Sequence, residues 1–242
     1  MPTIGFIYPD HAAEDDYPLA EQLLGSDLGD TRLPVEHIYG TDLHAVPELL
    51  DLGSPARLAE GAALLAKHEP DAVVWACTSG SFVYGWDGAR EQAAKLSTAA
   101  GVPASSTSFA FVHAARELGI HRVAVAASYP DEIAQLFVEF LNAGGIEVVS
   151  MGSADITTAA EVGELSAEAI VTLALSHDHP AAEAVLVPDT AMRTLTEVNT
   201  IEDKLRKPVL TANQVTVWEG LRLAGETRLV RSLGALFRRR GE

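Results

Sequence analysis

Short apolar runs alternate with amphipathic segments along the whole chain. Most of the apolar runs are β-branched and lack polar alternation, which predicts strands covered on both faces. These runs are Thr3–Tyr8, Pro34–Ile38, Ala72–Ala76, Val102–Ala104, Arg122–Ala127, Glu147–Ser150, Ala184–Val187 and Val209–Thr211. The segments between them predict helices over Ala56–His68, Asp87–Ala99, Ala110–Leu118, Asp131–Ala143, Thr158–Ser176, Thr196–Leu205 and Val215–Leu223. Such alternation predicts an α/β fold with parallel sheets and right-handed crossovers.

Three motifs recur in the same order in the two halves of the chain. "IGFIYPD" resembles "VAVAASYPD", "DAVVWACTSGS" resembles "EAVLVPDTAMR", and "GVPASSTSFAFVHAARELGI" resembles "RKPVLTANQVTVWEGLRLAGE". This repeat predicts two similar flavodoxin-like (Rossmann-like) lobes, related by a pseudo-twofold axis, with the active site in the cleft between them. The expected N-terminal lobe is 1–118 plus 215–242, and the expected C-terminal lobe is 119–214.

Polar residues gather where the predicted strands end. In folds of this type, ligands bind beyond the carboxyl ends of the strands. The candidates at these ends are Tyr8, Pro9, Asp10, Cys77, Thr78, Ser79, Ser105–Thr107, Ser128, Tyr129, Asp189, Thr190, Asn213 and Gln214. Cys77 and Asp189 occupy matching positions in the two copies of one motif, so we expect them on opposite sides of one ligand.

Cys77 is the one cysteine of the chain and precedes the sequence "TSGS", where a helix is expected to begin. A helix N-terminus lowers the pKa of a thiol, so we expect a reactive thiol. Such a thiol suits proton transfer to carbon, or addition to an activated double bond. The neighbouring hydroxyl groups of Thr78 and Ser79 could hold a carboxylate or a developing enediolate. The alternative for a lone cysteine is a small apolar core residue.

The motifs "ACTSGS", "AASYPDE", "VPDTAMRT" and "TANQVTVWEGLRLAG" resemble the Asp/Glu racemase superfamily. Within it they resemble the branch of maleate cis-trans isomerases and arylmalonate decarboxylases, over nearly the whole chain. The resemblance implies an enzyme without cofactor or metal that acts on a small carboxylate, and it allows a homodimer. It places Cys77 at the first catalytic cysteine, Thr78 and Ser79 in the anion pocket, and Tyr129 as a donor to a substrate carboxylate. Pro9 matches the proline after the first strand.

Two positions depart from the pattern of that superfamily. Asp189 stands where isomerases and racemases have a second cysteine, and Asp10 stands near a position where isomerases have asparagine. Asp189 could be a structural carboxylate, as a helix N-cap or as an ion-pair partner of Arg193 four residues on. It could instead be an acid or base, if its surroundings kept it protonated, or it could bind a positive group of the substrate.

Asn213 and Thr190 complete the set of expected substrate contacts. The amide of Asn213 in the sequence "TANQ" could donate to a substrate carboxylate, and a turn with a helix cap is the alternative. Thr190 follows Asp189 at the end of the same strand.

A single competent thiol disfavours two-base racemisation. We therefore expect a decarboxylase of the arylmalonate decarboxylase type, in which Cys77 protonates an enediolate that Thr78, Ser79 and Tyr129 hold. The thiol would act from the face opposite to that used by the arylmalonate decarboxylase, and would give the opposite enantiomer. The alternatives are a maleate cis-trans isomerase, an Asp/Glu-type racemase, and a non-catalytic carboxylate-binding protein.

Composition narrows the remaining possibilities for the 242 residues. The net charge of −17 disfavours binding to nucleic acids and to anionic membranes. No apolar run approaches the length of a membrane span, and the single cysteine and the N-terminal sequence predict a cytoplasmic protein. We find no phosphate-binding or metal-binding motif. The sequences "SHDHP" and "LFRRRGE" are expected to be solvated segments rather than binding sites.

Overall fold

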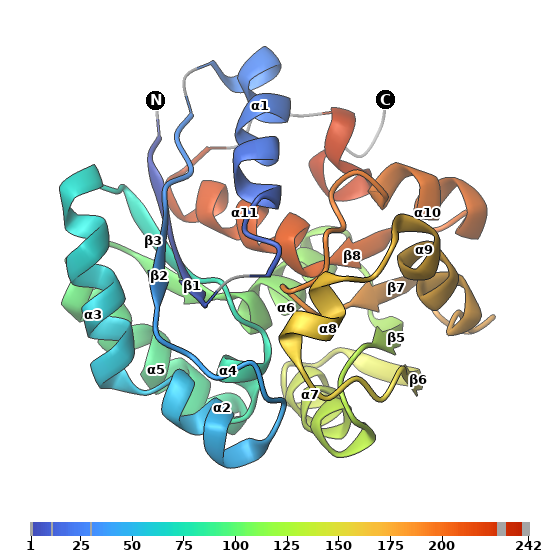
Figure 1. The fold of residues 1–242 in the computed structure, drawn as a ribbon. Coiled ribbons are helices and arrows are strands. Elements are labelled where there is room, and N and C mark those ends of the chain that lie inside the picture. The colour runs from blue at the N-terminus through green and yellow to red at the C-terminus, as the bar shows by residue number, and fades with distance from the viewer. Residues whose placement is uncertain (1, 11, 30, 227–230, 239–242) are drawn as a thin grey trace.

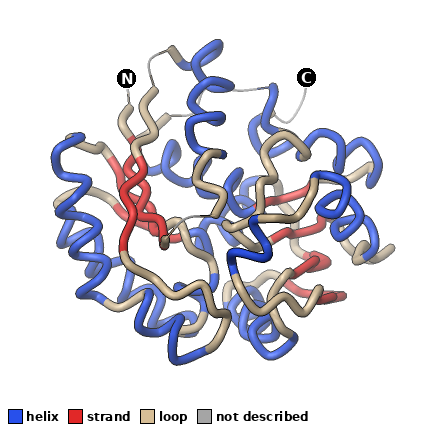
Figure 2. Tube along the Cα trace, in the orientation of Figure 1, coloured by secondary structure: helices blue, strands red, loops and turns tan. Residues whose placement is uncertain are grey.

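The computed structural model describes residues 2–10, 12–29, 31–226 and 231–238. Two four-stranded parallel sheets have the same strand order, β2-β1-β3-β4 and β6-β5-β7-β8. The first contains β1 (Ile4–Pro9), β2 (Val35–Ile38), β3 (Ala72–Trp75) and β4 (Ala104–Ser106). The second contains β5 (Arg122–Ala127), β6 (Glu147–Ser153), β7 (Ala184–Val187) and β8 (Val209–Thr211). The expected α/β fold with two similar parallel sheets is confirmed, and Figure 2 shows the strands as two separate groups.

Helices surround both sheets (Figure 1). The first half of the chain contains α1 (Asp16–Leu28), α2 (Val46–Leu52), α3 (Pro55–Leu65), α4 (Ser79–Phe82), α5 (Gly85–Ala100) and α6 (Thr107–Glu117). The second half contains α7 (Asp131–Ala143), α8 (Ala159–Gly163), α9 (Ala167–Ser176), α10 (Val198–Leu205) and α11 (Ala212–Leu223). Short 3₁₀ helices lie at Ala66–His68, Arg231–Leu233 and Ala235–Phe237. The strands β3 and β7 are buried at every residue, as central strands of covered parallel sheets must be.

All eight predicted strands are present, with ends that differ by up to three residues. The prediction of one helix over Thr158–Ser176 was wrong, because two helices, α8 and α9, occupy this range. Ser166 interrupts it: the Ser166 hydroxyl accepts a hydrogen bond from Ala169 N–H at 3.2 Å and caps α9. Helices α1 and α2 were not predicted, whereas α4 begins within "TSGS", where the start of a helix was expected. In α1, buried Tyr17, Ala20 and Leu24 follow helical spacing, but acidic and polar residues surround them.

Helix α11 packs against the first sheet although it follows the last strand of the second. Its Gly220 lies against Ile4 of β1 so closely that a Cβ atom there would be 2.2 Å from Ile4 Cγ2. The hydroxyl groups of Thr107 and Thr216 form a hydrogen bond of 2.7 Å between α6 and α11. These contacts bring α11 to the first sheet, whereas Ala235 N–H and Arg238 bind Glu202 of α10 in the second half. The assignment of 215–242 to the first lobe and the boundaries at residues 118 and 214 stay a prediction.

The sequence "SHDHP" leads from α9 towards β7, and its His179 and Asp178 bind neighbouring groups of the same lobe. The Asp178 carboxylate and the His179 carbonyl oxygen accept hydrogen bonds from Lys207. In "LFRRRGE", Leu236 and Phe237 are buried, Arg238 is the last described residue, and 239–242 lie outside the described residues. None of the helices in the described ranges is long and apolar enough to cross a membrane.

Candidate active site

A cavity of about 80 Å³ lies at the carboxyl ends of the strands, where the two lobes meet. Seven of the predicted strand-end candidates line it: Tyr8, Pro9, Asp10, Cys77, Ser79, Asp189 and Thr190. The remaining lining residues are Ala12, Thr41, Asp42, His44, Leu49, Leu52, Ala159, Ala160 and Ala191. The structure thus brings Cys77 of one repeat and Asp189 of the other to the wall of the same cavity.

The Cys77 thiol is held by the turn that follows β3. Gly80 N–H donates to its Sγ at 3.3 Å, and the Ser79 hydroxyl lies 3.7 Å from Sγ. A Cβ atom on Gly80 would be 3.1 Å from Sγ and 3.0 Å from the Trp75 ring, so the turn accommodates only glycine without displacing its neighbours.

The expected lowering of the Cys77 pKa was wrong. Burial raises the pKa of this thiol to about 11, and the negative charge of Asp189 adds to the rise. The hydrogen bonds from Gly80 and Ser79 act in the opposite direction without offsetting the burial. Helix α4 has only four residues, so its N-terminus offers little of the stabilisation that a longer helix would give a thiolate. The thiol is therefore protonated at neutral pH.

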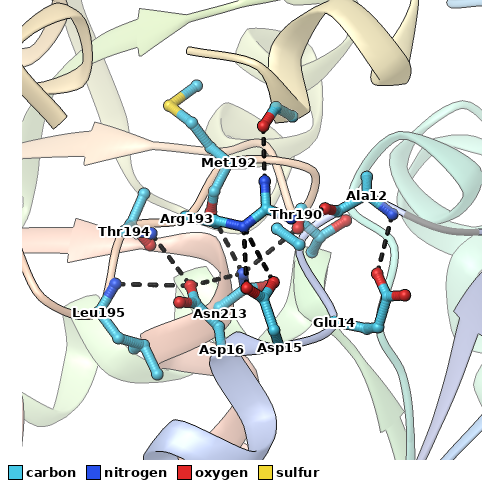
Figure 3. A network of polar contacts seen from close by, with 12 residues as sticks. Ala12, Glu14, Asp15, Asp16, Thr190, Met192, Arg193, Thr194, Leu195 and Asn213 are labelled. Atoms are coloured by element: carbon cyan, nitrogen blue, oxygen red, sulfur yellow. Dashed lines mark hydrogen bonds and ion pairs between the residues drawn. The ribbon is translucent and has the colours of Figure 1, made fainter. Parts of the chain in front are cut away.

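Asp189 is fixed by hydrogen bonds within its own lobe. Its Oδ2 accepts a short hydrogen bond from the Ser128 hydroxyl, and its Oδ1 accepts one from Ala191 N–H at 2.9 Å. Arg193 does not form the ion pair with Asp189 that was one of the alternatives, because it points to another carboxylate. Arg193 Nε donates to both oxygens of Asp15 at 3.0 Å (Figure 3).

Arg193 instead fastens a segment that covers the cavity. Its guanidinium also donates to the carbonyl oxygens of Ala12, at 2.6 Å, and Gly163. Ala12 lines the cavity, and Gly163 ends α8, whose first residues line it as well. Residues 12–16 lead into α1 and are tied to the second lobe by Arg193.

Asn213 supports the wall of the cavity without lining it. Its side-chain nitrogen lies within hydrogen-bond distance of Asp16 Oδ2 (2.9 Å) and of the carbonyl oxygens of Thr190 (3.3 Å) and Met192 (3.2 Å), as Figure 3 shows. It stands in the first turn of α11, which a reciprocal pair of hydrogen bonds between Thr211 and Gln214 caps. The structure thus shows the turn and helix cap that the sequence offered as the alternative to substrate binding.

Thr78 and Tyr129 lie behind the lining residues. The Tyr129 hydroxyl donates to the Pro188 carbonyl oxygen at 2.7 Å, and burial raises its pKa well above the usual range. Thr78 Oγ1 is buried near Tyr129 and makes no hydrogen bond of ordinary geometry to the described residues. Buried hydroxyl groups are rarely left unpaired, so Thr78 has capacity for a further partner.

Three polar lining residues were not predicted from the sequence: Thr41, Asp42 and His44. They follow β2 in the segment 39–45, and His44 Nε2 lies 3.9 Å from Asp189 Oδ2. The rule that ligands bind beyond strand ends would have indicated this segment, had it been applied to the edge strand β2 as it was to β1, β3 and β4. Tyr8 was among the strand-end candidates; its hydroxyl donates to the Thr190 carbonyl oxygen at 2.8 Å.

Fold and cavity together define a two-lobed α/β protein with a thiol and a carboxyl group at equivalent strand ends. A family model described as arylmalonate decarboxylase matches residues 54–237. The chain therefore belongs to the arylmalonate decarboxylase family, and the resemblance expected from its motifs is confirmed.

Curated relatives include both kinds of enzyme named above. Arylmalonate decarboxylase of Bordetella bronchiseptica is 26% identical over 129 residues, which cover 52% of this chain and 54% of that protein. Maleate isomerase of Geobacillus stearothermophilus is 28% identical over 136 residues, 56% of this chain and 54% of that protein. The matches thus span about half the length of these relatives.

Solved structures support the fold along nearly the whole chain. The maleate isomerase Iso from Pseudomonas putida S16 superimposes with a TM-score of 0.89 at 21% identity, covering 98% of both chains. A double mutant of arylmalonate decarboxylase in a liganded form gives 0.84 at 24% identity, covering 98% of this chain and 99% of that chain. At these sequence identities the structural similarity shows the fold alone, so the reaction must be argued from the residues of the cavity.

Proposed function

We propose that this protein is a cofactor-independent decarboxylase of a small malonate-type acid, with Cys77 as the proton donor. The observation that carries the proposal is the state of the thiol: it is buried at the cavity wall, and its pKa is raised to about 11. A protonated thiol is suited to give a proton to a carbanion. The family membership and the decarboxylase among the relatives support the same reaction.

The reaction balances with groups of this chain alone. The bond between the α-carbon and one carboxylate breaks, CO₂ leaves, and the electron pair passes into the remaining carboxylate as an enediolate. The Cys77 S–H bond then gives its proton to the α-carbon, and the resulting thiolate recovers a proton from water. Ser79, which lines the cavity, supplies the hydroxyl group placed to stabilise the enediolate, and the buried Thr78 and Tyr129 lie behind it.

The cavity suggests a small substituent on the acid. Its volume of about 80 Å³ lies below the range of roughly 300 to 1,000 Å³ that is typical for drug-sized ligands. Leu49 and Leu52 supply its apolar lining. A malonate with an alkyl substituent therefore fits the cavity better than one with a large aryl group.

Maleate isomerisation is the second candidate, because a maleate isomerase is among the relatives and maleate is a small diacid. That reaction starts with addition of a thiolate to the double bond, and the raised pKa of Cys77 leaves little thiolate at neutral pH. Racemisation is disfavoured further, because it needs a second proton donor and both oxygens of Asp189 accept hydrogen bonds.

Proton NMR in D₂O tests the proposal. The protein is offered methylmalonate, phenylmalonate, methyl-phenylmalonate, maleate and both enantiomers of aspartate, beside Cys77→Ala and Cys77→Ser variants. We expect an α-deuterated monocarboxylic acid from at least one malonate, and loss of this product in both variants. Fumarate from maleate would favour the isomerase, α-deuterated aspartate the racemase, and no product from any acid a carboxylate-binding protein.

A further inference from the structure

His44 is held over the cavity by the backbone of both lobes. It belongs to the segment 39–45, which leaves β2 and crosses to the second lobe. His44 N–H donates to the Thr157 carbonyl oxygen at 2.8 Å, and Ala159 N–H donates to the Asp42 carbonyl oxygen at 2.7 Å. These bonds form an antiparallel bridge at Leu43 and Thr158, so the position of His44 is fixed on both sides.

The hydrogen bond of one ring nitrogen determines what the other can do. His44 Nδ1 lies 3.2 Å from the Ile156 carbonyl oxygen. A carbonyl oxygen can only accept, so Nδ1 carries a hydrogen atom. Nε2 therefore faces Asp189 either as a bare lone pair or, in an imidazolium, as a second N–H group. A lone pair against a carboxylate oxygen is unfavourable in a site where the side chains are only 5% and 4% exposed, whereas an imidazolium forms an ion pair.

The distance between His44 and Asp189 leaves the Nε2–H group of an imidazolium available to a ligand. The distance of 3.9 Å between Nε2 and Asp189 Oδ2 allows an ion pair but exceeds that of a hydrogen bond. Asp189 already accepts hydrogen bonds from Ser128 and Ala191. The Nε2–H group of His44 can therefore donate to an acceptor that enters the cavity.

The charge of the lining makes such a donor necessary for an anionic ligand. Three carboxyl groups line the cavity, those of Asp10, Asp42 and Asp189. Among the described lining residues, His44 is the one side chain that can carry a positive charge. A second carboxylate of a substrate needs a charge-assisted donor to enter such a cavity.

The ring of His44 is also held in one orientation. It packs edge-on against the Tyr129 ring, with centroids 5.0 Å apart and planes at 90°. Tyr129 in turn packs against Phe82, with centroids 5.8 Å apart, and its hydroxyl is bound to Pro188, the residue before Asp189. The imidazole and its carboxylate partner are thus positioned by the same corner of the second lobe.

We propose that Asp189 holds His44 as an imidazolium, and that His44 Nε2–H binds a carboxylate of a small dicarboxylate substrate. The inference rests on the proposed function for the class of substrate. Asp189 is then a positioning residue that acts through His44, and Cys77 remains the single proton donor. The carboxylate that replaces the second thiol thus orients an anchor for the substrate, and the anchor itself, His44, comes from the first half of the chain.

Nitrogen NMR of the histidine side chains tests the imidazolium directly. In the ¹⁵N-labelled protein at neutral pH, the signal of His44 is assigned by its loss in His44→Asn. We expect both ring nitrogens to show the shifts of a protonated ring, and the Asp189→Asn variant to show a neutral ring. A neutral His44 ring in the unsubstituted protein would overturn the proposal.

Calorimetric binding of succinate and malonate tests the anchor without any turnover, in a Cys77→Ala background. Asparagine at 44 can still donate to the Ile156 carbonyl oxygen while it removes Nε2. We expect His44→Asn and Asp189→Asn each to weaken binding by about tenfold or more, the effect of losing one charge-assisted hydrogen bond. His121→Asn, at an exposed histidine outside the cavity, is the matched control and should bind as the background does.

The Asp189→Asn variant distinguishes an imidazolium from a neutral His44 ring, because the two states predict opposite changes in the affinity for a diacid. If His44 were neutral, removal of the Asp189 charge would strengthen the binding of a dianion, because a repulsion would disappear. Tighter binding in this variant, unchanged binding in His44→Asn, or no binding of either diacid to the background would each overturn the proposal. If diacid binding depends on His44 but the protein has no decarboxylase activity, His44 is the anchor and the proposed reaction is rejected.

Discussion

The Cys77 thiol and the Asp189 carboxyl group line one cavity from equivalent ends of the third strand of each sheet, β3 and β7. The two copies of the sequence repeat thus form equivalent sheets, and at the matching strand ends one copy has a thiol and the other a carboxyl group. The charge of Asp189 adds to the burial that raises the Cys77 pKa, so the carboxyl group of one lobe helps to keep the thiol of the other protonated.

The titration of Cys77 follows from this arrangement. With a pKa near 11, its thiolate should be scarce at neutral pH and appear only in strongly alkaline solution. The ultraviolet absorbance of the thiolate, measured against pH as a difference from Cys77→Ala, reports this directly. A transition near the ordinary cysteine value of about 8.5 would contradict the raised pKa of the buried thiol.

Gly80→Ala should disturb the thiol through packing. The added Cβ atom would lie 3.1 Å from Cys77 Sγ and 3.0 Å from the Trp75 ring, so one of them must move. We expect a loss of stability of about 1 to 3 kcal/mol, as for overpacked cores, and a larger loss in kcat than in substrate binding. Denaturant unfolding and steady-state kinetics measure the two effects. Gly25→Ala in α1, where the added atom would meet nothing within 4 Å, is the control.

Arg193→Lys should loosen the cover of the cavity with little effect on global stability. Lysine keeps the charge but cannot reach Asp15 and the Ala12 and Gly163 carbonyl oxygens together. Because Arg193 is 45% exposed, the stability cost should stay below about 1 kcal/mol. We expect KM to rise severalfold and amide hydrogen exchange in residues 12–16 to quicken. Unchanged exchange in this segment would show that other contacts hold it.

Asp16 should make the stability depend on pH. Burial raises its pKa from 3.8 to about 6, against the opposing hydrogen bonds of Asn213, Thr194 and Leu195. The folded state therefore prefers the protonated carboxyl, so this residue destabilises the fold increasingly as the pH rises from about 4 to about 6. The full effect is about 3 kcal/mol.

The comparison with Asp16→Asn isolates that effect from other titrating groups. Relative to this variant, the free energy of unfolding of the unsubstituted protein should fall as the pH rises from 4 to 7, and level off above 6. A difference between the two proteins that stays constant with pH would reject the raised pKa of Asp16.

The sequence predicted the architecture because strand burial and the internal repeat are local patterns. The eight strands follow from the buried apolar runs, the matching positions of Cys77 and Asp189 follow from the repeat, and seven lining residues follow from the rule on strand ends. The thiol's protonation state could not be predicted in this way, since it depends on how deeply the fold buries Cys77. The true partners of Arg193 and Asp189 also depend on contacts between distant segments: Asp15 lies 178 positions from Arg193, and His44 belongs to the other half of the chain.

The stereochemistry of one reaction tests the central claim, that the Cys77 thiol delivers the proton. 2-Ethyl-2-methylmalonate, an alkyl-substituted malonate whose product has a chiral α-carbon, is decarboxylated in D₂O, and the enantiomers of the deuterated monoacid are separated. A fixed donor on one wall of the cavity predicts a large excess of one enantiomer, and no product with Cys77→Ala. A racemic product, or one formed equally well by Cys77→Ala, would show that solvent or another group protonates the intermediate and would contradict the account.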